Sequence, residues 1–345
     1  MNSRTLTAST LLLLFSFTAS GSLPSAPSGA TGPAKADPTL EEGRKLTSLL
    51  LRGEAAEILK RFSPGLRERA MTGGQVVSLI DSWRQQYGKE LKVVSEKTDS
   101  LAGTRRYLRT ATFEKEQGPV EVAWAFNAKD EVTAVSMRLQ QVAARTDKSA
   151  YRTKTPLRLP FDGAWTVWWG GPTLWQNVHA TSAEQRFAVD FFVVKDGRTH
   201  AGDGAKNEDY LAWGRPVLAP AAGTVVRAQD GRPDGRPGYV DAAAEPPGNY
   251  VVLDHGNGEF SCLLHLQNGS VAVKPGAKVK AGDPLAMTGS SGRTPEPVLH
   301  FHLQDTSDLA KGAGLPATFR SYAADGKRVA TGHPARGQQV TPAPR

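Results

Sequence analysis

Residues 298–303 read VLHFHL and place two of the chain's seven histidines one residue apart in an otherwise apolar run. Residues i and i+2 of a β-strand point to the same side, so this stretch predicts a strand with His300 and His302 on one face. Imidazole rings that share a face lose water and need partners, which could be a metal ion, a carboxylate or a backbone group. Two histidines that are hydrogen-bonded to other protein groups, with a purely structural role, would also fit an isolated H-x-H pattern. The interpretation therefore depends on the rest of the chain.

Short alternating segments with frequent Gly and Pro precede this stretch. They are WTVWWGG (165–171), RFAVDFFVV (186–194), GTVVRAQ (223–229), NYVVLDHG (249–256), EFSCLLHL (259–266), SVAVKPG (270–276) and DPLAMTGSSG (283–292). Such runs, separated by turn residues, are typical of antiparallel all-β domains. We therefore expect a β-rich domain over residues 157–325 and a mobile tail over residues 326–345.

Residues 39–142 combine two periodicities. LEEGRKLTSLLLRG (40–53), EAAEILKRFSPGLRERA (54–70) and TGGQVVSLIDSWRQQYG (72–88) carry apolar residues at helical spacing, and the segments that follow alternate. Helices followed by a strand meander predict a small α+β domain. The element order is similar to the cystatin-like and nuclear-transport-factor-like cone folds, a resemblance that carries no catalytic residues. The polar stretch 143–156 is expected to link the two domains.

The N-terminus has the features of an export signal. Arg4 is followed by the short apolar core LLLLFSF and by small residues, which predicts a cleaved signal over residues 1–22 and leaves no membrane span afterwards. Residues 23–38 are rich in Ser, Pro, Gly and Ala and are expected to be a disordered linker. The mature protein is then periplasmic or extracellular.

The composition narrows the kinds of site the chain can hold. Cys262 is the only cysteine, which excludes an intramolecular disulfide and a multi-cysteine zinc cluster, so a metal must use His, Asp or Glu. We expect Cys262 to pack as a small hydrophobe on the face opposite His265. The net charge is +8, but the sequence contains no dense run of basic residues. This distribution favours an ordinary solvated surface over a surface that binds nucleic acid. We expect a monomer.

Asp190 stands in an apolar run, RFAVDFFVV, that has the pattern of a buried strand. A carboxylate there costs several kcal/mol unless it is paired with a cation or bound to a metal. A salt bridge to an arginine is one solution. His179 lies just upstream and His265 ends another apolar strand, so the chain also offers a His₂-carboxylate set, which is the catalytic pattern of zinc hydrolases.

From about Trp165 to Asp305 the sequence resembles the lysostaphin-type (LytM-like) zinc metallopeptidases, which cut peptide bonds in bacterial peptidoglycan. The resemblance rests on an upstream His with a following Asp, a later HL at a strand end, the terminal H-x-H, and the intervening segments PVLAPAAGTVV, NYVVLDHGNG and VAVKPGAKVKAGDPLAMTGSSG. It implies an antiparallel lysostaphin-type sheet and an exported endopeptidase acting on stem or cross-bridge peptides.

The resemblance also implies the roles of individual residues. One Zn²⁺ would be held by His179, Asp190 and His302, while His265 and His300 would flank the zinc-bound water. The sequence has no HExxH motif, so one of these two histidines is the expected base and the other binds the oxyanion. Which of them takes which role stays open. The spacer between His179 and Asp190 is ten residues, longer than in the best-known members, and it must form a hairpin that returns the acid to the site.

Three other interpretations compete with this one. A non-catalytic family member could bind the cell wall or activate an amidase, although the ligand set is retained here. A secreted protease could act on Gly-rich protein. The segments AAGTVVRAQ and VKPGAKVKAGDPL also resemble biotinyl and lipoyl carrier domains, which need a modifiable lysine at a hairpin tip. The sequence around His200 and His255 favours structural or surface roles for these two residues.

Overall fold

The computed structural model describes residues 37–70, 73–101, 104–116, 118–140, 144, 147–174 and 176–343. The predicted signal and nearly all of the predicted linker 23–38 lie outside these residues. The chain divides into two compact units, Met1–Gln140 and Gln141–Arg345. The described residues are mostly β-sheet with few helices. Among the helices that the structure describes, none has both the length and the apolar character needed to span a bilayer.

Four helices open the first unit: α1 (Pro38–Arg52), α2 (Ala55–Leu59), α3 (Pro64–Ala70) and α4 (Gly73–Tyr87). The carboxylate of Asp37 accepts a hydrogen bond from the backbone N–H of Thr39 and so caps α1. Gly53 ends this helix in the left-handed conformation, with φ of 82°. Helix α1 therefore begins and ends at residues whose chemistry is typical of caps.

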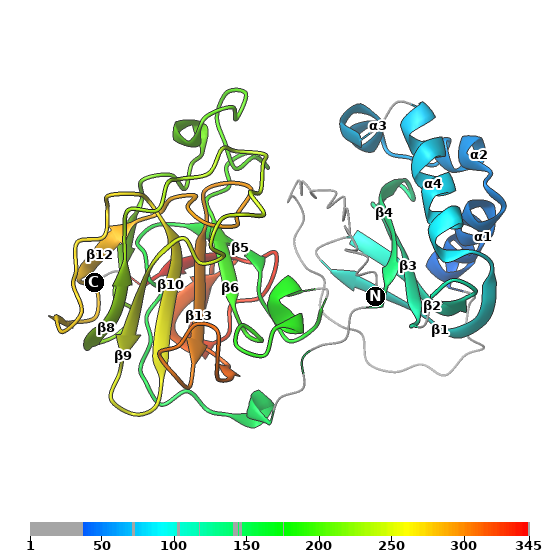
Figure 1. Ribbon diagram of the computed structural model, residues 1–345. Coiled ribbons are helices and arrows are strands. Elements are labelled where there is room, and N and C mark those ends of the chain that lie inside the picture. Colours follow the sequence, from blue (N-terminus) through cyan, green and yellow to red (C-terminus); the bar gives the residue numbers. More distant parts are fainter. Residues whose placement is uncertain are drawn as a thin grey trace, which may run out of the picture. The chain divides into compact units, whose positions relative to one another are not determined.

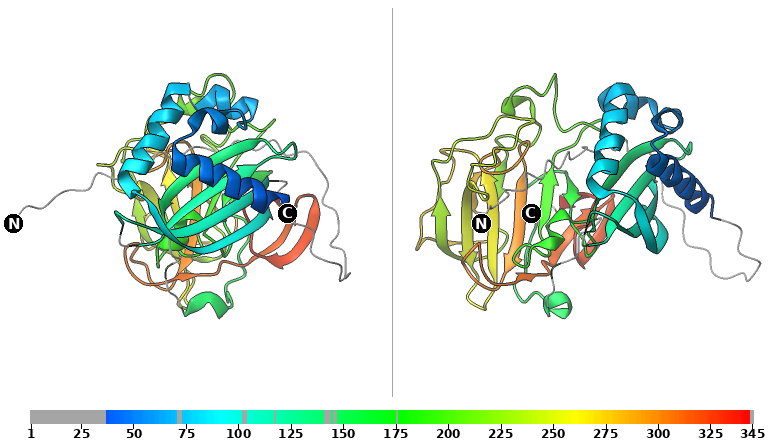
Figure 2. Two further views of the ribbon diagram at one scale, coloured as in Figure 1. Left: turned by 90° about the vertical axis from the view of Figure 1, so that its right-hand side faces the viewer. Right: turned by 45° about the vertical axis from the view of Figure 1, so that its right-hand side comes forward.

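The helices are followed by a four-stranded antiparallel meander, β1 (Glu90–Leu101), β2 (Thr104–Phe113), β3 (Val120–Phe126) and β4 (Val132–Leu139). Figure 2 shows α1 lying across this sheet. The core between them contains Leu46, Leu50, Tyr107 and Trp124. This order agrees with the predicted α+β arrangement, while the likeness to a cystatin-like cone stays a prediction.

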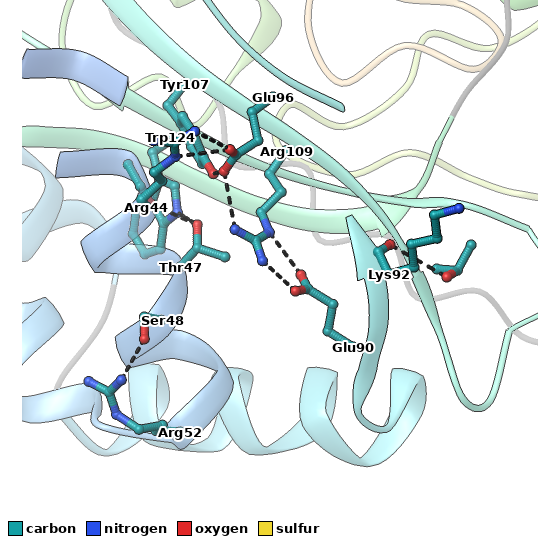
Figure 3. Close-up of polar contacts among 12 residues, drawn as sticks. Arg44, Thr47, Ser48, Arg52, Glu90, Lys92, Glu96, Tyr107, Arg109 and Trp124 are labelled. Atoms are coloured by element: carbon teal, nitrogen blue, oxygen red, sulfur yellow. Dashed lines mark hydrogen bonds and ion pairs between the residues drawn. The ribbon is translucent and has the colours of Figure 1, made fainter. Parts of the chain in front are cut away.

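Polar side chains also tie α1 to the sheet of the first unit (Figure 3). Glu96 on β1 accepts hydrogen bonds from Arg44 on α1 and from Tyr107 and Arg109 on β2. Arg109 also binds Glu90, so one carboxylate pair holds one guanidinium between neighbouring strands. The side chain of Arg44 is 54% exposed, so its pair with Glu96 is worth little by itself, and the buried core residues hold α1 on the sheet.

The second unit contains a large sheet with the strand order β11-β8-β9-β10-β13-β6-β5-β17-β15-β16, to which β14 is added beside β13 (Figure 1). The bounds are β5 (Trp165–Trp169), β6 (Val189–Phe192), β8 (Gly223–Gln229), β9 (Asn249–Asp254), β10 (Phe260–Leu266), β11 (Lys278–Val279), β13 (Leu299–Gln304), β14 (Gly314–Leu315), β15 (Phe319–Ala324), β16 (Lys327–Gly332) and β17 (Gln339–Pro342). Strands β7 (Pro216–Leu218) and β12 (Pro284–Met287) form a separate pair. All of the pairings between these strands are antiparallel.

The ends of the second unit differ from the prediction. Residues 326–345 were expected to be a mobile tail, but β16 and β17 belong to the sheet and the side chain of Val340 is fully buried. Part of the predicted linker 143–156 also belongs to this unit, because the buried carboxylate of Glu259 accepts hydrogen bonds from Tyr151, Lys154 and Thr155. Both segments are held by contacts with distant residues that local composition does not reveal.

The central strands of the large sheet have two different faces. Leu299, Phe301 and Leu303 of β13 pack into the main core together with Val189 and Phe191 of β6. The alternate residues of both strands point to the opposite face. This face carries the candidate site.

Candidate metal centre

Asp190 and His300 lie opposite each other on neighbouring strands. Strands β6 and β13 pair with Asp190 and His300 as direct Cα partners. The Nδ1 atom of His300 lies 2.8 Å from Oδ1 of Asp190, and both residues are buried. The register of this pair therefore brings a carboxylate against an imidazole on the face away from the main core.

A short 3₁₀ helix, η2 (Val178–Thr181), brings His179 to the same carboxylate. The Nε2 atom of His179 lies 2.9 Å from Oδ2 of Asp190. Asn177, fully buried, organises this approach: its Oδ1 accepts from the backbone N–H of His179, and its Nδ2 donates to the carbonyls of Arg186 and Ala188. The ten-residue spacer is thus closed by one side chain that links its beginning to its end.

His179, Asp190 and His300 each offer one ligand atom, and these atoms all lie within 4.8 Å of one another. Burial alone would raise the pKa of Asp190, but His179 and His300 outweigh that effect and keep the pKa below its ordinary value. Burial lowers the pKa of His300, and Asp190 opposes this shift. Two imidazoles and one ionised carboxylate form a His₂-carboxylate donor set, which fits a zinc ion with an open position.

His302 lies outside this set. Its Nδ1 is 3.1 Å from Nε2 of His300, and its Nε2 is 3.0 Å from Oε1 of Gln304. Burial, followed by the charge of His300, lowers its pKa well below the usual value. The expected roles, with His302 as ligand and His300 beside the metal, differ from this geometry. The physical reason is the register, which puts Asp190 opposite His300 rather than His302.

His265 approaches the set from β10. The pairing of β10 with β9 shifts its register between Leu264 and Leu266, and His265 has a left-handed backbone with φ of 62°. Its ring centroid lies 5.9 Å from that of His300, and its Nδ1 lies 2.8 Å from the carbonyl of Ser291. Burial, with a further contribution from His300, lowers the pKa of His265 to about 4.

The register shift also changes which face His265 shares with Cys262, which was expected on the opposite face. This residue is the Cα partner of His302 and packs with Val252 and Leu264, away from the main core. Simple alternation puts Cys262 and His265 on opposite faces, whereas the shift at Leu264 and Leu266 turns His265 toward the face that holds Cys262. Burial raises the pKa of the thiol well above its usual range, so it packs as a neutral group.

The other histidines of the described chain lie apart from this set. The ring of His255 contacts the carbonyl of Ala222 and the hydroxyl of Ser261, in keeping with a structural role. His200 packs against Tyr210. His333 is exposed and contacts the carbonyl of Ala317.

Sequence reasoning missed two residues that organise the site, Asn177 and Gln304. Gln304 continues the alternation of His300 and His302, so the pattern H-x-H-x-Q would have put it on the same face. Asn177 stands directly before η2, where Asn is a favoured N-cap residue. Both signals are local and weak on their own.

We expect Asn177→Ala to destabilise the second unit and to weaken metal binding. The substitution leaves the N–H of His179 and two buried carbonyls without their partner, at a cost of about 1–3 kcal/mol for each unsatisfied group. Urea unfolding and zinc titration would measure both effects. Asn177→Asp keeps the acceptor for His179 and should retain more metal affinity than Asn177→Ala; equal affinities would contradict this role for the Asn177 oxygen.

We expect the metal-free protein to lose stability on acidification from pH 7 to pH 5. Burial lowers the folded-state pKa of His265 to about 4, whereas the pKa of an unperturbed histidine is about 6.5. The unfolded chain then binds a proton that the folded chain excludes, so the stability contributed by His265 is present above pH 6.5 and is lost toward pH 4, by about 1.4 kcal/mol per pH unit. His300 and His302, whose pKa values are also lowered, add to this loss. Urea unfolding in chelator at pH 7, 6 and 5 checks this, with the non-titrating His265→Asn as control. An equally steep loss in that variant would assign the effect to other groups.

Residues 208–311 match the family described as Peptidase family M23. The murein hydrolase activator EnvC of Escherichia coli (strain K12) is 36% identical over 105 residues, which are 29% of this chain and 23% of that protein. The peptidoglycan DD-endopeptidase ShyA of Vibrio cholerae serotype O1 is 43% identical over 56 residues, 16% of this chain and 13% of that protein. The chain thus spans less than a quarter of the length of these relatives.

Among solved structures, a zinc-containing peptidase from Vibrio cholerae is 18% identical, with a TM-score of 0.30, over 73% of this chain and 65% of that chain. Within this chain, the segment that matches the peptidase family contains His265, His300 and His302. His179 and Asp190 precede it.

Proposed function

We propose that the chain, which carries a domain of peptidase family M23, is an exported zinc-dependent endopeptidase. It would hydrolyse peptide bonds in bacterial peptidoglycan. The observation that carries this proposal is the convergence of His179, Asp190 and His300, whose ligand atoms lie within 4.8 Å of one another. The name of ShyA, a peptidoglycan DD-endopeptidase, supports cell-wall peptides as the substrate class.

We assign the metal ligands to His179, Asp190 and His300, and His302 to a supporting position. Zinc bound there would lower the pKa of water to about 7 and polarise the scissile carbonyl. Asp190 supplies the negative charge of the set. The contact of Asp190 with both imidazoles keeps the three donors together before any ion arrives.

His265 is the proposed general base. The carbonyl of Ser291 can only accept a hydrogen bond, so Nδ1 of His265 carries the proton and Nε2 carries the lone pair. This nitrogen can take a proton from the attacking water and return it to the leaving amine. The bond to Ser291 fixes the ring orientation, and the left-handed backbone turns the ring toward His300.

Digestion of purified peptidoglycan sacculi tests this function. The full chain loaded with zinc should release fragments with new amino termini, and mass analysis of the fragments would identify the bond. Chelator should stop the reaction and added zinc should restore it. Intact sacculi after incubation with a protein that holds one zinc per chain would contradict the endopeptidase proposal.

A second candidate function is activation of a murein hydrolase. Two observations favour it. Of the two histidines that lie beside the ligand set, His302 is engaged with His300 and Gln304, which leaves His265 to do the work expected of two. In addition, a similar protein is named as the murein hydrolase activator EnvC. An activator would leave sacculi intact alone and accelerate their digestion by a purified murein amidase. The same sacculi assay, run with and without the amidase, separates the two functions.

We further propose that the protein acts as a monomer outside the cytoplasmic membrane, with the first unit positioning the second at its substrate. The substrate class supports this location, because peptidoglycan lies outside that membrane. Fractionation of cells that express the full chain would test the location. Recovery in the cytosol would contradict it.

A further inference from the structure

Four buried side chains form one continuous line of contacts on the site face of the second unit. Asp190 contacts Nδ1 of His300, Nε2 of His300 contacts Nδ1 of His302, and Nε2 of His302 contacts Oε1 of Gln304. The exposed fraction of His300, His302 and Gln304 is 2% or less, so the contacts among these side chains are shielded from water. In such a line, the position of each proton decides what the next group can bind.

Gln304, at the end of the line farthest from Asp190, determines which atoms donate and which accept the hydrogen bonds. Its Nε2 donates to the backbone carbonyls of Thr306 and Asp308, the latter at 3.0 Å. Carbonyls only accept hydrogen bonds, so the amide nitrogen must face them and the amide oxygen must face His302. His302 therefore carries its proton on Nε2 and has a lone pair on Nδ1.

The same logic continues to His300. The lone pair on Nδ1 of His302 accepts from Nε2–H of His300, so in the neutral ring of His300 the Nδ1 atom carries the lone pair. The line has three contacts, and two neutral rings supply only two N–H groups. The contact without a proton is the one between Nδ1 of His300 and the Asp190 carboxylate, which are 2.8 Å apart. A proton on Nδ1 of His300 can fill this contact in the metal-free chain, and a metal ion bound between the two atoms would take the place of that proton.

We propose that Gln304 and His302 are positioning residues that fix the tautomer of His300 and direct its Nδ1 lone pair toward the metal shared with Asp190. This inference rests on the metal site of the proposed function. Metal-binding histidines usually donate their other N–H to a fixed partner, and loss of that partner typically lowers metal affinity by 10–100-fold. Here the partner is a second histidine, and the amide of Gln304 ties it to the backbone of residues 306 and 308.

Three substitutions of His302 test the proposal by zinc affinity, measured on the full chain in competition with a chromophoric chelator. His302→Ala should weaken binding by about 10–100-fold. His302→Asn places an amide oxygen near the position of Nδ1, where it can accept from His300, and should restore affinity to within a few-fold of the original chain. His302→Gln has a similar polarity but places its amide near Nε2, so it should behave like His302→Ala.

The results separate three explanations. The order Asn tighter than Gln and Ala supports tautomer control. Equal affinity of all three variants and the original chain would overturn the proposal. Complete loss of zinc in all three, with unfolding midpoints close to that of the original chain, would also overturn it, because His302 would then be a ligand itself. An original chain that binds no zinc would instead refute the proposed function on which this inference rests.

Nitrogen-15 NMR of the histidine rings gives a second readout that needs no substitution. In the zinc-loaded chain, His302 should be protonated on Nε2 alone, and His300 should be protonated on Nε2 with Nδ1 shifted by the metal. A proton on Nδ1 of His302 would overturn the proposal. This measurement stays informative if the His302 variants fold poorly.

Discussion

Asp190→Ala is expected to abolish zinc binding and peptidoglycan hydrolysis together. The substitution removes the charged ligand and the acceptor that both His179 and His300 face, so the two imidazoles are left without the group that gathers them. A site with two neutral donors is a poor zinc site, because structural and catalytic zinc sites use at least three protein ligands. Zinc content after dialysis and fragment release from sacculi would fall to background.

His300→Ala should reproduce both losses, which separates the present assignment from one in which His300 acts only beside the metal. Asp203→Ala is a suitable control, because Asp203 is an exposed acid whose carboxylate bonds only to the backbone of Ala205 among the described contacts. This control should keep zinc and activity. Normal zinc content in Asp190→Ala would refute the ligand set.

His265→Asn is expected to keep one zinc per chain and to lower turnover by about 10²–10⁴-fold, the usual contribution of a general base. Asparagine tolerates the left-handed backbone that His265 adopts, with φ of 62°. Its amide N–H can also preserve the bond to the carbonyl of Ser291. The substitution therefore removes the Nε2 lone pair with little change to the backbone.

Turnover on sacculi and zinc content, measured on the same preparation, check this expectation. The exposed His333, changed to alanine, provides a histidine control that should leave both quantities unchanged. Unaltered turnover in His265→Asn would contradict its role as base. Loss of zinc in this variant would instead make His265 part of the ligand set.

The face shared by His300 and His302 could be predicted from the sequence because it depends only on alternation within one strand. Strand β13 spans Leu299–Gln304, and its apolar residues pack into the main core as the pattern requires. The helices and the meander of the first unit were predictable for the same reason, since their periodicity is local.

The assignment of roles within the pair could not be derived from that pattern. Which histidine meets Asp190 depends on the register between β6 and β13, two strands more than a hundred residues apart in sequence. The position of His265 depends on a register shift and a left-handed residue, which alternation treats as an ordinary strand position. The strands β16 and β17 were missed because short polar strands at the end of a chain have the composition of a tail.

The ten-residue spacer between His179 and Asp190 shows that one buried polar side chain can bring together two ligands that lie far apart in the sequence. Asn177 bonds to the backbone of His179 at one end and to those of Arg186 and Ala188 at the other. The separation of ligands in sequence is therefore a weaker constraint than the hydrogen bonds that close the loop between them.

The most direct test of a metal centre built from His179, Asp190 and His300 is anomalous diffraction from crystals of the full chain, recorded on both sides of the zinc absorption edge. We predict a single zinc peak about 2.0–2.2 Å from Nε2 of His179, a carboxylate oxygen of Asp190 and Nδ1 of His300. The absence of a peak at these atoms, or a peak bound by a nitrogen of His302 in place of His300, would contradict the account.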